Sequence, residues 1–469
     1  MSEKIELHVV QEMPVGYGNR GIDGRPKYGT LGGTRRIRVS SQAWRRAMRS
    51  YLLEKLAKAD GTHGTYSVRT RRLPREIADA LVKSGMGKDD ALLLARAAVA
   101  AGMHVDRNNK PNSGTNQLTA KVADDDDADL TSTMLVFSKD APQEIADAIR
   151  SALDADPSFL DTAAAWNEAR KAYRAAEEAA RTPRGRRASR EDEAEAGAEA
   201  EAGGEAGEAD SPADTPKGRK PARGEAVPEP PDPIVPDVVR DAVRKSLHET
   251  GVAIDVALLG RFVAVLPDAK VDGSVQVAHA LGTGANGEIS DFFVAVDDLV
   301  RADEAAVAHV GSDRVLSGGT LYRHMVLDLD QLRRNVEAEG EEATEAVVDV
   351  AAGLVLHAFL ASTPRAGSTG SAPQTIPYVV LAGVGDFHAN MVGVFGSPIV
   401  GSDAADRLCR AWETNRVGMF GPRFSAGWTG TMGVALPEGI TACATADAVV
   451  DSALKEAFGR PVSDWKISS

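Results

Sequence analysis

The hydrophobic period changes from two to about 3.6 at Ser40-Ser41, which constrains the chain to a strand followed directly by a helix. In residues 36–39, Arg36 and Arg38 alternate with branched aliphatic side chains. This alternation predicts a short strand that presents its arginines on an open face. The two serines are good helix N-caps, because a side-chain hydroxyl can accept a hydrogen bond from an unpaired helix N–H group.

Two different faces are predicted for the helix that begins at this point. Gln42, Arg45 and Arg49 are spaced i, i+3 and i+7 and share a polar face, and Arg46 lies beside it. The opposite face is an apolar stripe formed by Trp44, Met48, Tyr51, Leu52 and Leu56.

Basic residues are concentrated in this part of the chain, although the whole chain carries a net charge of −14. Residues 1–58 contain twelve Lys or Arg and five Asp or Glu, and residues 35–49 contain six arginines and no acid. Arginine forks and a helix N-terminus both bind phosphate, and salt screens the distant acidic regions. The stretch therefore predicts a polyanion-binding groove; the alternative is a solvated basic face with scattered surface ion pairs.

The rest of the chain indicates an α+β protein with long insertions. Strands are predicted at residues 5–10, with Glu6 and His8 on an exposed face, at 255–266 and at 375–384. Residues 182–236 are rich in proline and contain no aromatic residue, so we expect them to be disordered, either as a tolerated insertion or as an accessory RNA contact. Helices are expected at residues 73–102, 142–181, 344–360, 403–415 and 446–458.

Composition argues against several other classes of protein. Cys409 and Cys443 are far apart and the nine histidines are scattered, so neither a disulfide scaffold nor a metal cofactor is expected. The N-terminus lacks the pattern of a secretory signal, and Asp349 interrupts the longest apolar run, so we expect a cytoplasmic protein with no membrane span.

Two further motifs have ordinary explanations. GTGANG at residues 282–287 matches a dinucleotide fingerprint, but no helix start follows it, so a hairpin tip is the better interpretation. The acidic run at 124–129 is interpreted as a solvated loop, with a cation site as the alternative. Phe262, Phe292 and Phe293 lie beside turns or cations and belong either to the core or to a surface that stacks on bases.

Several segments, taken in order, resemble the CasC family, the repeated backbone subunit of the type I-E CRISPR complex Cascade. They are NRGIDGRPK (19–27), GGTRRIRVSSQAWRRAMR (32–49), DVALLGRF (255–262), VDGSVQVAHAL (271–281), DFFVAVDDL (291–299) and AHVGSDRVLSGGTLYRHMVLDLDQL (308–332). The resemblance covers about residues 1–60 and 250–335 well.

This resemblance implies a hand-shaped protein in which a modified RRM (ferredoxin-like) palm carries a helical fingers insertion and a β-hairpin thumb. The corresponding boundaries are 1–58 (palm, first part), 59–181 (fingers), 182–236 (disordered insertion), 237–270 (palm, continued), 271–310 (thumb) and 311–469 (palm, C-terminal part). It also implies RNA contacts at Arg20, Lys27, Ser40, Gln42, Arg45, Arg46, Arg49, Arg261, Phe262 and Phe293.

The function that the resemblance implies is RNA binding without catalysis. Copies of the chain would polymerise along a CRISPR RNA and present it to target DNA, together with the other type I-E Cascade subunits and without a cofactor. One alternative is a metal-dependent RNA endonuclease of a related CRISPR complex, in which Asp23 would be the catalytic aspartate. The other is a standalone RNA-binding protein.

Overall fold

The computed structural model describes residues 3–59, 65–103, 130–131, 133–180, 233–249, 253–263, 266–292, 294–296, 307–310, 314–336, 340–417, 421–430, 433–462 and 465–466. The chain divides into two compact units. Unit 1 comprises Met1–Val68, Val136–Lys139 and His248–Ser469, and unit 2 comprises Arg69–Leu135 and Asp140–Leu247. The predicted disorder of 182–236 and the acidic run at 124–129 lie outside the described residues, apart from 233–236, and stay predictions.

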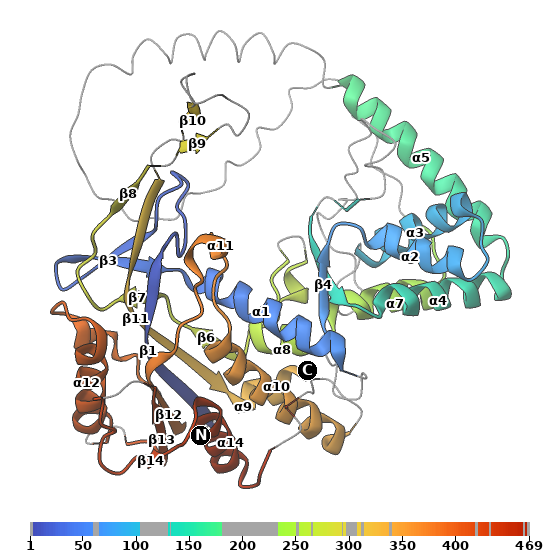
Figure 1. Ribbon diagram of the computed structural model, residues 1–469. Helices are drawn as coiled ribbons and strands as arrows, with labels where there is room; N and C mark the ends of the chain where they lie inside the picture. Colours follow the sequence, from blue (N-terminus) through green and yellow to red (C-terminus); the bar gives the residue numbers. More distant parts are fainter. Residues whose placement is uncertain are drawn as a thin grey trace. The chain divides into compact units, whose positions relative to one another are not determined.

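Unit 1 is built on a large mixed sheet with ten strands in the described part of the chain (Figure 1). The strands are β1 (Lys4–Gly16), β2 (Tyr28–Leu31), β3 (Thr34–Val39), β6 (Val275–Val277), β7 (Ala280–Gly282), β8 (Ile289–Asp291), β11 (Arg314–Asp328), β12 (Pro377–Gly385), β13 (Phe424–Thr429) and β14 (Thr441–Ala442). Their order is β14-β13-β12-β1-β11-β7-β3-β2, and β6 and β8 also pair with β11. The β13–β14 pair is parallel, whereas β1 is antiparallel to both of its neighbours.

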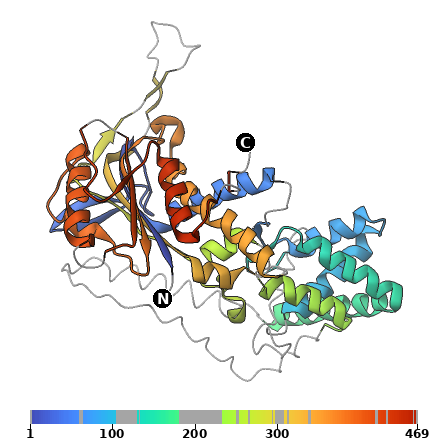
Figure 2. The ribbon, with the colours of Figure 1, turned by 90° about the horizontal axis from the view of Figure 1, so that it is seen from below.

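Helices of unit 1 cover both faces of this sheet. They are α1 (Ser41–Lys58), α8 (Ile254–Leu259), η2 (Pro267–Ala269), α9 (Leu329–Asn335), α10 (Glu341–Ala361), α11 (Ser368–Ser371), η3 (Met391–Phe395), α12 (Gly401–Ala411), the π-helical η4 (Trp412–Val417) and α14 (Ala446–Phe458). One core joins the sheet to α1, α8, α10 and α14, and a second joins its other face to η3 and α12. Figure 2 shows strands of the sheet between α12 and α14.

Most of the elements predicted in unit 1 are confirmed. The strand at 375–384 is β12, and the helices at 344–360, 403–415 and 446–458 are α10, α12 with η4, and α14. Strand β1 is also present, but its predicted exposed face is wrong. Glu6 and His8 are 1% and 0% exposed, because η3, η4 and α12 cover the face opposite to the one that carries Ile5, Leu7 and Val9.

Helix α1 forms as its sequence predicts. The Ser40 side chain caps it by accepting a hydrogen bond from the Ala43 N–H group. Trp44, Met48, Leu52 and Leu56 are buried at helical spacing, whereas Gln42 and Arg46 on the polar side are exposed.

The strand predicted at 255–266 is wrong, since its first half is helix α8. All six side chains of α8 are buried. The sequence therefore lacks the alternation of polar and apolar residues that would distinguish a buried helix from a buried strand. The helix ends at Gly260, whose φ of +75° is costly for residues with a side chain. A Cβ atom at Gly260 would also lie 2.6 Å from the Val271 carbonyl oxygen, so glycine is required there on two counts.

The prediction that β3 presents its arginines on an open face is also wrong for Arg36, which is fully buried. Its guanidinium donates to the carbonyl groups of Thr283, Phe395 and Gly396, and burial lowers its pKa. Arg36 therefore holds the β2–β3 hairpin to the end of η3 and does not face solvent. Arg38 is half-buried, and Arg35 is exposed.

The segment predicted as a thumb contains strands of two kinds. Strands β6 and β7 pair with β11 and belong to the main sheet. Further along, β9 (Val294–Val296) and β10 (Val307–Val310) form a separate antiparallel pair. Within residues 271–310, β9 and β10 are thus the described strands that lie outside the main sheet.

Unit 2 contains the helices that the Ala- and Leu-rich stretches predict. These are α2 (Leu73–Lys83), α3 (Lys88–Met103), α4 (Ala141–Ala155) and α5 (Phe159–Ala180). A further helix, α7 (Asp237–His248), was not predicted. Helix α2 packs on both α3 and α4, and α3 packs on α5. Strands β4 (Ser67–Thr70) and β5 (Leu135–Ser138) form a further two-stranded sheet, and most of their residues belong to unit 1.

By length and composition, helix α10 could cross a membrane, but 67% of its apolar window is buried inside the structure. Its side chains pack against β1, β11 and β12 in the larger core of unit 1. Asp349 lies within the helix, 2.6 Å from the guanidinium of Arg460, and does not interrupt it. The apolar composition of α10 is therefore accounted for by core packing.

Candidate nucleic-acid interface

A pocket of about 700 Å³ lies beside the first turns of α1. Three parts of unit 1 line it: the loop after β1, helix α1, and the loop at residues 364–366. Its cationic lining residues are Lys27, Arg46 and Arg365, and no acidic residue of the described chain lines it. A pocket with this charge beside a helix N-terminus suits a phosphate-bearing ligand.

Hydrogen bonds fix the loop after β1 against the start of α1. The Asn19 side chain accepts a hydrogen bond from the Ser40 N–H group at 3.1 Å, and the Asn19 carbonyl accepts one from the Lys27 N–H group at 2.8 Å. The Arg38 N–H group donates to the Lys27 carbonyl at 2.9 Å. Lys27 is therefore held at the pocket by its own backbone, and Ser40, whose oxygen caps the helix, can still donate its hydroxyl proton.

The surroundings of His279 indicate a positive electrostatic potential at the N-terminus of α1. Its Nδ1 atom accepts a hydrogen bond from the Ser41 N–H group at 3.0 Å, which leaves the ring proton on Nε2 in the neutral form. Burial and the positive charges of Arg38 and Lys27 lower the pKa of His279. His279 therefore lies at the edge of the basic region.

A second pocket of about 720 Å³ adjoins the first, because the same two loops line both. Arg20, Arg25 and Arg314 line it, and the Arg20 guanidinium lies 3.5 Å from the centre of the Tyr17 ring. Asp23 also lines this pocket, and its carboxylate accepts a hydrogen bond from the Arg25 N–H group at 3.1 Å. Asp23 has no second acid or histidine beside it among the lining residues of the described chain.

Arg45 and Arg49 are bonded within unit 1. The Arg45 guanidinium donates to the Leu259 carbonyl, and burial lowers its pKa. The Arg49 side chain binds Asp255 at 2.7 Å and the Ser67 carbonyl at 2.7 Å. Both arginines therefore have intramolecular roles in this structure, and their assignment to RNA stays a prediction.

Two further predicted site residues, Arg261 and Phe262, do not line either pocket. Arg261 is buried and donates to the carbonyl groups of His248, Glu249 and Ala269. The adjacent Phe262 is 75% exposed, and Phe292 is 60% exposed. Phe293 lies outside the described residues.

Sequence reasoning missed Arg365 and Arg314, which line the two pockets. Arg365 belongs to a loop rich in Pro, Gly and Ser, and Arg314 begins a long strand. A single basic residue in a loop does not indicate a binding site in the sequence. Only the fold shows that the loop with Arg365 faces the N-terminus of α1.

The fold is shared with chains of known structure. One comes from an assembly described as "CRISPR RNA-guided surveillance complex, pre-nicking", with a TM-score of 0.66 and 23% identity over 97% of this chain and 100% of that chain. Another comes from a "CRISPR RNA-guided surveillance complex", with a TM-score of 0.61 and 20% identity over 97% of this chain and 99% of that chain. No curated protein matches the sequence.

These likenesses define a mixed α+β fold of the kind found in CRISPR surveillance complexes. The model of the CT1975-like protein family (Cas_CT1975) matches residues 5–448. The chain belongs to this family.

Proposed function

We propose that the chain is a guide-RNA-binding backbone subunit of a type I-E CRISPR surveillance complex. The observation that carries this proposal is the pair of adjoining basic pockets, which share two loops of unit 1 beside the N-terminus of α1. The printed descriptions of the structurally similar chains, which name RNA-guided complexes, support the same ligand.

The chemistry of the pockets suits the backbone of a single strand. Lys27, Arg46 and Arg365 would neutralise phosphates in the first pocket, and Arg20 and Arg314 in the second. The Gln42 side chain and the Ser40 hydroxyl add uncharged hydrogen bonds. Contacts of this kind position a strand without reading its sequence, so specificity would come from base pairing by the guide.

Exposed aromatic side chains complete the proposed interface. Phe262 is 75% exposed, and an aromatic face open to solvent can stack on a base. In the proposed hand-shaped arrangement, unit 1 is the palm, unit 2 the fingers, and the β9–β10 pair the tip of the thumb. Neighbouring copies would stack along the RNA, with target DNA and the other subunits bound in the assembled cytoplasmic complex.

The proposed role is non-catalytic and requires no cofactor. The endonuclease alternative depends on Asp23, whose carboxylate shapes its own turn through the Arg25 N–H group. Three arginines line the same pocket, which favours retention of phosphates.

The decisive experiment is co-expression with the other complex subunits and a CRISPR array, followed by sequencing of the RNA that co-purifies. A uniform guide from the array, in a large assembly, is the expected result. A double Lys27→Ala, Arg46→Ala variant should lose this RNA, whereas Arg334→Ala, which removes an exposed arginine on α9, should retain it. Heterogeneous cellular RNA, or none, in the wild-type preparation would contradict the proposal.

A further inference from the structure

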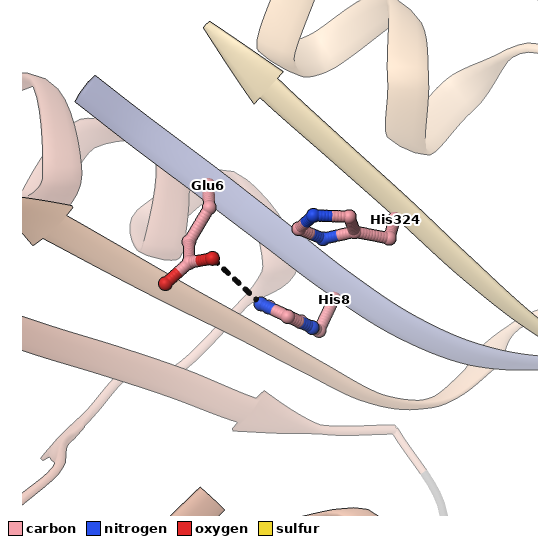
Figure 3. A group of neighbouring side chains, drawn as sticks. All are labelled: Glu6, His8 and His324. Atoms are coloured by element: carbon pink, nitrogen blue, oxygen red, sulfur yellow. Dashed lines mark ion pairs between the residues drawn. The ribbon is translucent and has the colours of Figure 1, made fainter. Parts of the chain in front are cut away.

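A buried cluster of one carboxylate and two imidazoles lies in unit 1, away from the basic pockets. Figure 3 shows Glu6 and His8 on β1 and His324 on the neighbouring β11. His8 and His324 are directly opposite each other in the strand register. The three residues are 1%, 0% and 4% exposed, and their potential ligand atoms all lie within 4.8 Å of one another.

Neighbouring groups fix the orientation of both imidazoles. The Nδ1 atom of His324 lies 3.2 Å from the Leu7 carbonyl oxygen, so Nδ1 carries the proton and Nε2 keeps its lone pair. The Nδ1 atom of His8 lies 2.8 Å from the Tyr322 hydroxyl, which itself accepts a hydrogen bond from the Met391 N–H group. Histidines that bind metals are held in this way, through the ring nitrogen that does not bind the ion.

The inner nitrogen of His8 faces the Glu6 carboxylate. The Nε2 atom of His8 lies 3.2 Å from a Glu6 carboxylate oxygen, yet within the described chain it makes no hydrogen bond of good geometry. The same carboxylate oxygen accepts a hydrogen bond from the Ala389 N–H group at 3.1 Å. A carboxylate removed from water is costly unless a cation or several donors compensate it.

We propose that Glu6, His8 and His324 form a binding site for a divalent transition-metal ion, with zinc as the expected occupant. Two imidazoles and one carboxylate are a ligand set that zinc accepts. Zinc bonds of about 2.0–2.1 Å at tetrahedral angles place ligand atoms about 3.3 Å apart. The His8–Glu6 distance of 3.2 Å already fits this spacing.

The His324 ring must rotate and shift to complete the site. One of its nitrogen atoms lies within 4.8 Å of the other ligand atoms, a limit about 1.5 Å above the tetrahedral spacing, and binding requires that Nε2 turn toward them. On binding, the proton of His8 would reside on Nδ1 and be donated to the Tyr322 oxygen.

The role of such an ion would be structural. It would join β1, from the start of the chain, to β11, which lies more than 300 residues later, and it would neutralise the Glu6 carboxylate. Ala389 and Met391 donate their N–H groups to Glu6 and Tyr322, so the loop before η3 would be fixed by the same centre.

The test measures the metal content of the full chain. Because the three side chains are almost inaccessible, the ion must be offered while the protein folds. The chain, co-expressed with its complex in zinc- or cobalt-supplemented medium, should carry about one ion per copy. The cobalt form should show the visible absorption bands of a tetrahedral site.

Glu6→Gln and His324→Phe, which keep the size of the side chains, should each lose the ion and the cobalt bands. His357→Gln is the matched control, because His357 forms a second imidazole–carboxylate pair, with Asp447 at 3.2 Å, outside the cluster. A wild-type chain without zinc or cobalt, or variants that keep the full metal content, would overturn the proposal. The metal content of the wild-type chain tests the proposal even if a variant fails to fold.

Discussion

The Arg49 side chain donates a hydrogen bond of 2.7 Å to Asp255, a carboxylate that is fully buried and 206 residues away in the sequence. The same carboxylate also accepts hydrogen bonds from the N–H and hydroxyl groups of Ser67, at 2.6 and 2.7 Å. One arginine of the basic stretch thus supports the fold, while its neighbour Arg46 faces the pocket.

Replacing Arg49 with methionine should destabilise the chain by about 3 kcal/mol. The aliphatic stem is kept, but Asp255 remains buried without its cation, and an uncompensated buried charge is expensive. Denaturant unfolding measures the change. Arg46→Met is the control, because Arg46 lies on the same helix but is exposed. This change should alter the free energy of unfolding by no more than about 0.5 kcal/mol.

A double variant separates this ion pair from a general effect of losing an arginine. Asp255→Asn combined with Arg49→Met should cost less than the sum of the two single changes, because residues in contact are not additive. Additive costs would show that the two side chains do not stabilise each other.

The turn between β2 and β3 offers a comparison between adjacent glycines. Gly32 and Gly33 both have positive φ, +56° and +72°. A Cβ atom at Gly32 would lie 1.8 Å from the Gly396 carbonyl oxygen, whereas a Cβ atom at Gly33 meets nothing within 4 Å. Gly33→Ala should therefore lower the free energy of unfolding by about 1 kcal/mol, because alanine disfavours this backbone conformation.

Gly32→Ala should cost at least about 2 kcal/mol more than Gly33→Ala, because overlap with backbone forces the hairpin away from η3. Thermal unfolding of the two variants, side by side, measures the difference. Equal melting temperatures would mean that the close approach of Gly32 to Gly396 does not exist in solution.

Replacing Lys27 with alanine should raise the pKa of His279. The positive charge of Lys27 disfavours the imidazolium form, so its removal makes protonation easier. Because the pKa of His279 is lowered in the folded chain, its contribution to stability is fully present above the ordinary histidine value of ~6.5 and is lost as pH falls from that value through the lowered pKa. An NMR titration of the His279 ring in the free protein follows this change, and Lys4→Ala, at the far end of β1, should leave it unchanged.

Arg46→Ala should make RNA binding less sensitive to salt. Each phosphate neutralised on a single strand contributes about 0.7 to the slope of log K against log salt, so the magnitude of the slope should fall by roughly that amount. Affinity measured at several salt concentrations gives the slope. An unchanged slope would remove Arg46 from the proposed interface.

Asp23→Ala should leave RNA degradation unchanged. The Asp23 carboxylate accepts the Arg25 N–H group and has no partner acid or histidine among the lining residues of its pocket in the described chain. Incubation of the assembled complex with labelled target RNA, with and without magnesium, tests this expectation. Cleavage by the wild type that disappears in the variant would favour the endonuclease alternative.

Local features of unit 1 could be predicted because they depend on neighbouring residues. The Ser40 cap and the stripe of Trp44, Met48, Leu52 and Leu56 follow from helical spacing alone. The basic pocket was predicted in part for the same reason, since Gln42 and Arg46 lie on one helix, whereas Lys27 was indicated by the family resemblance alone.

Features that depend on distant partners could not be predicted. Nothing near Arg36 indicates that the carbonyl groups of Phe395 and Gly396 would enclose it, and nothing near Arg49 indicates Asp255. An alternating strand such as β1 shows the same pattern whether its second face meets water or a second helical layer. The cluster around His8 was missed for that reason.

The position of β1 has a consequence for synthesis on the ribosome. Lys4 pairs with Asp328 on one side and with Gly385 on the other. Strand β1 is therefore synthesised first, but the two strands that pair with it are synthesised much later. At ~5–20 residues per second, translation leaves β1 without partners for roughly 20–75 s. The loop that carries Arg365 emerges within the same interval, so neither basic pocket has all of its lining residues until most of the chain has been synthesised.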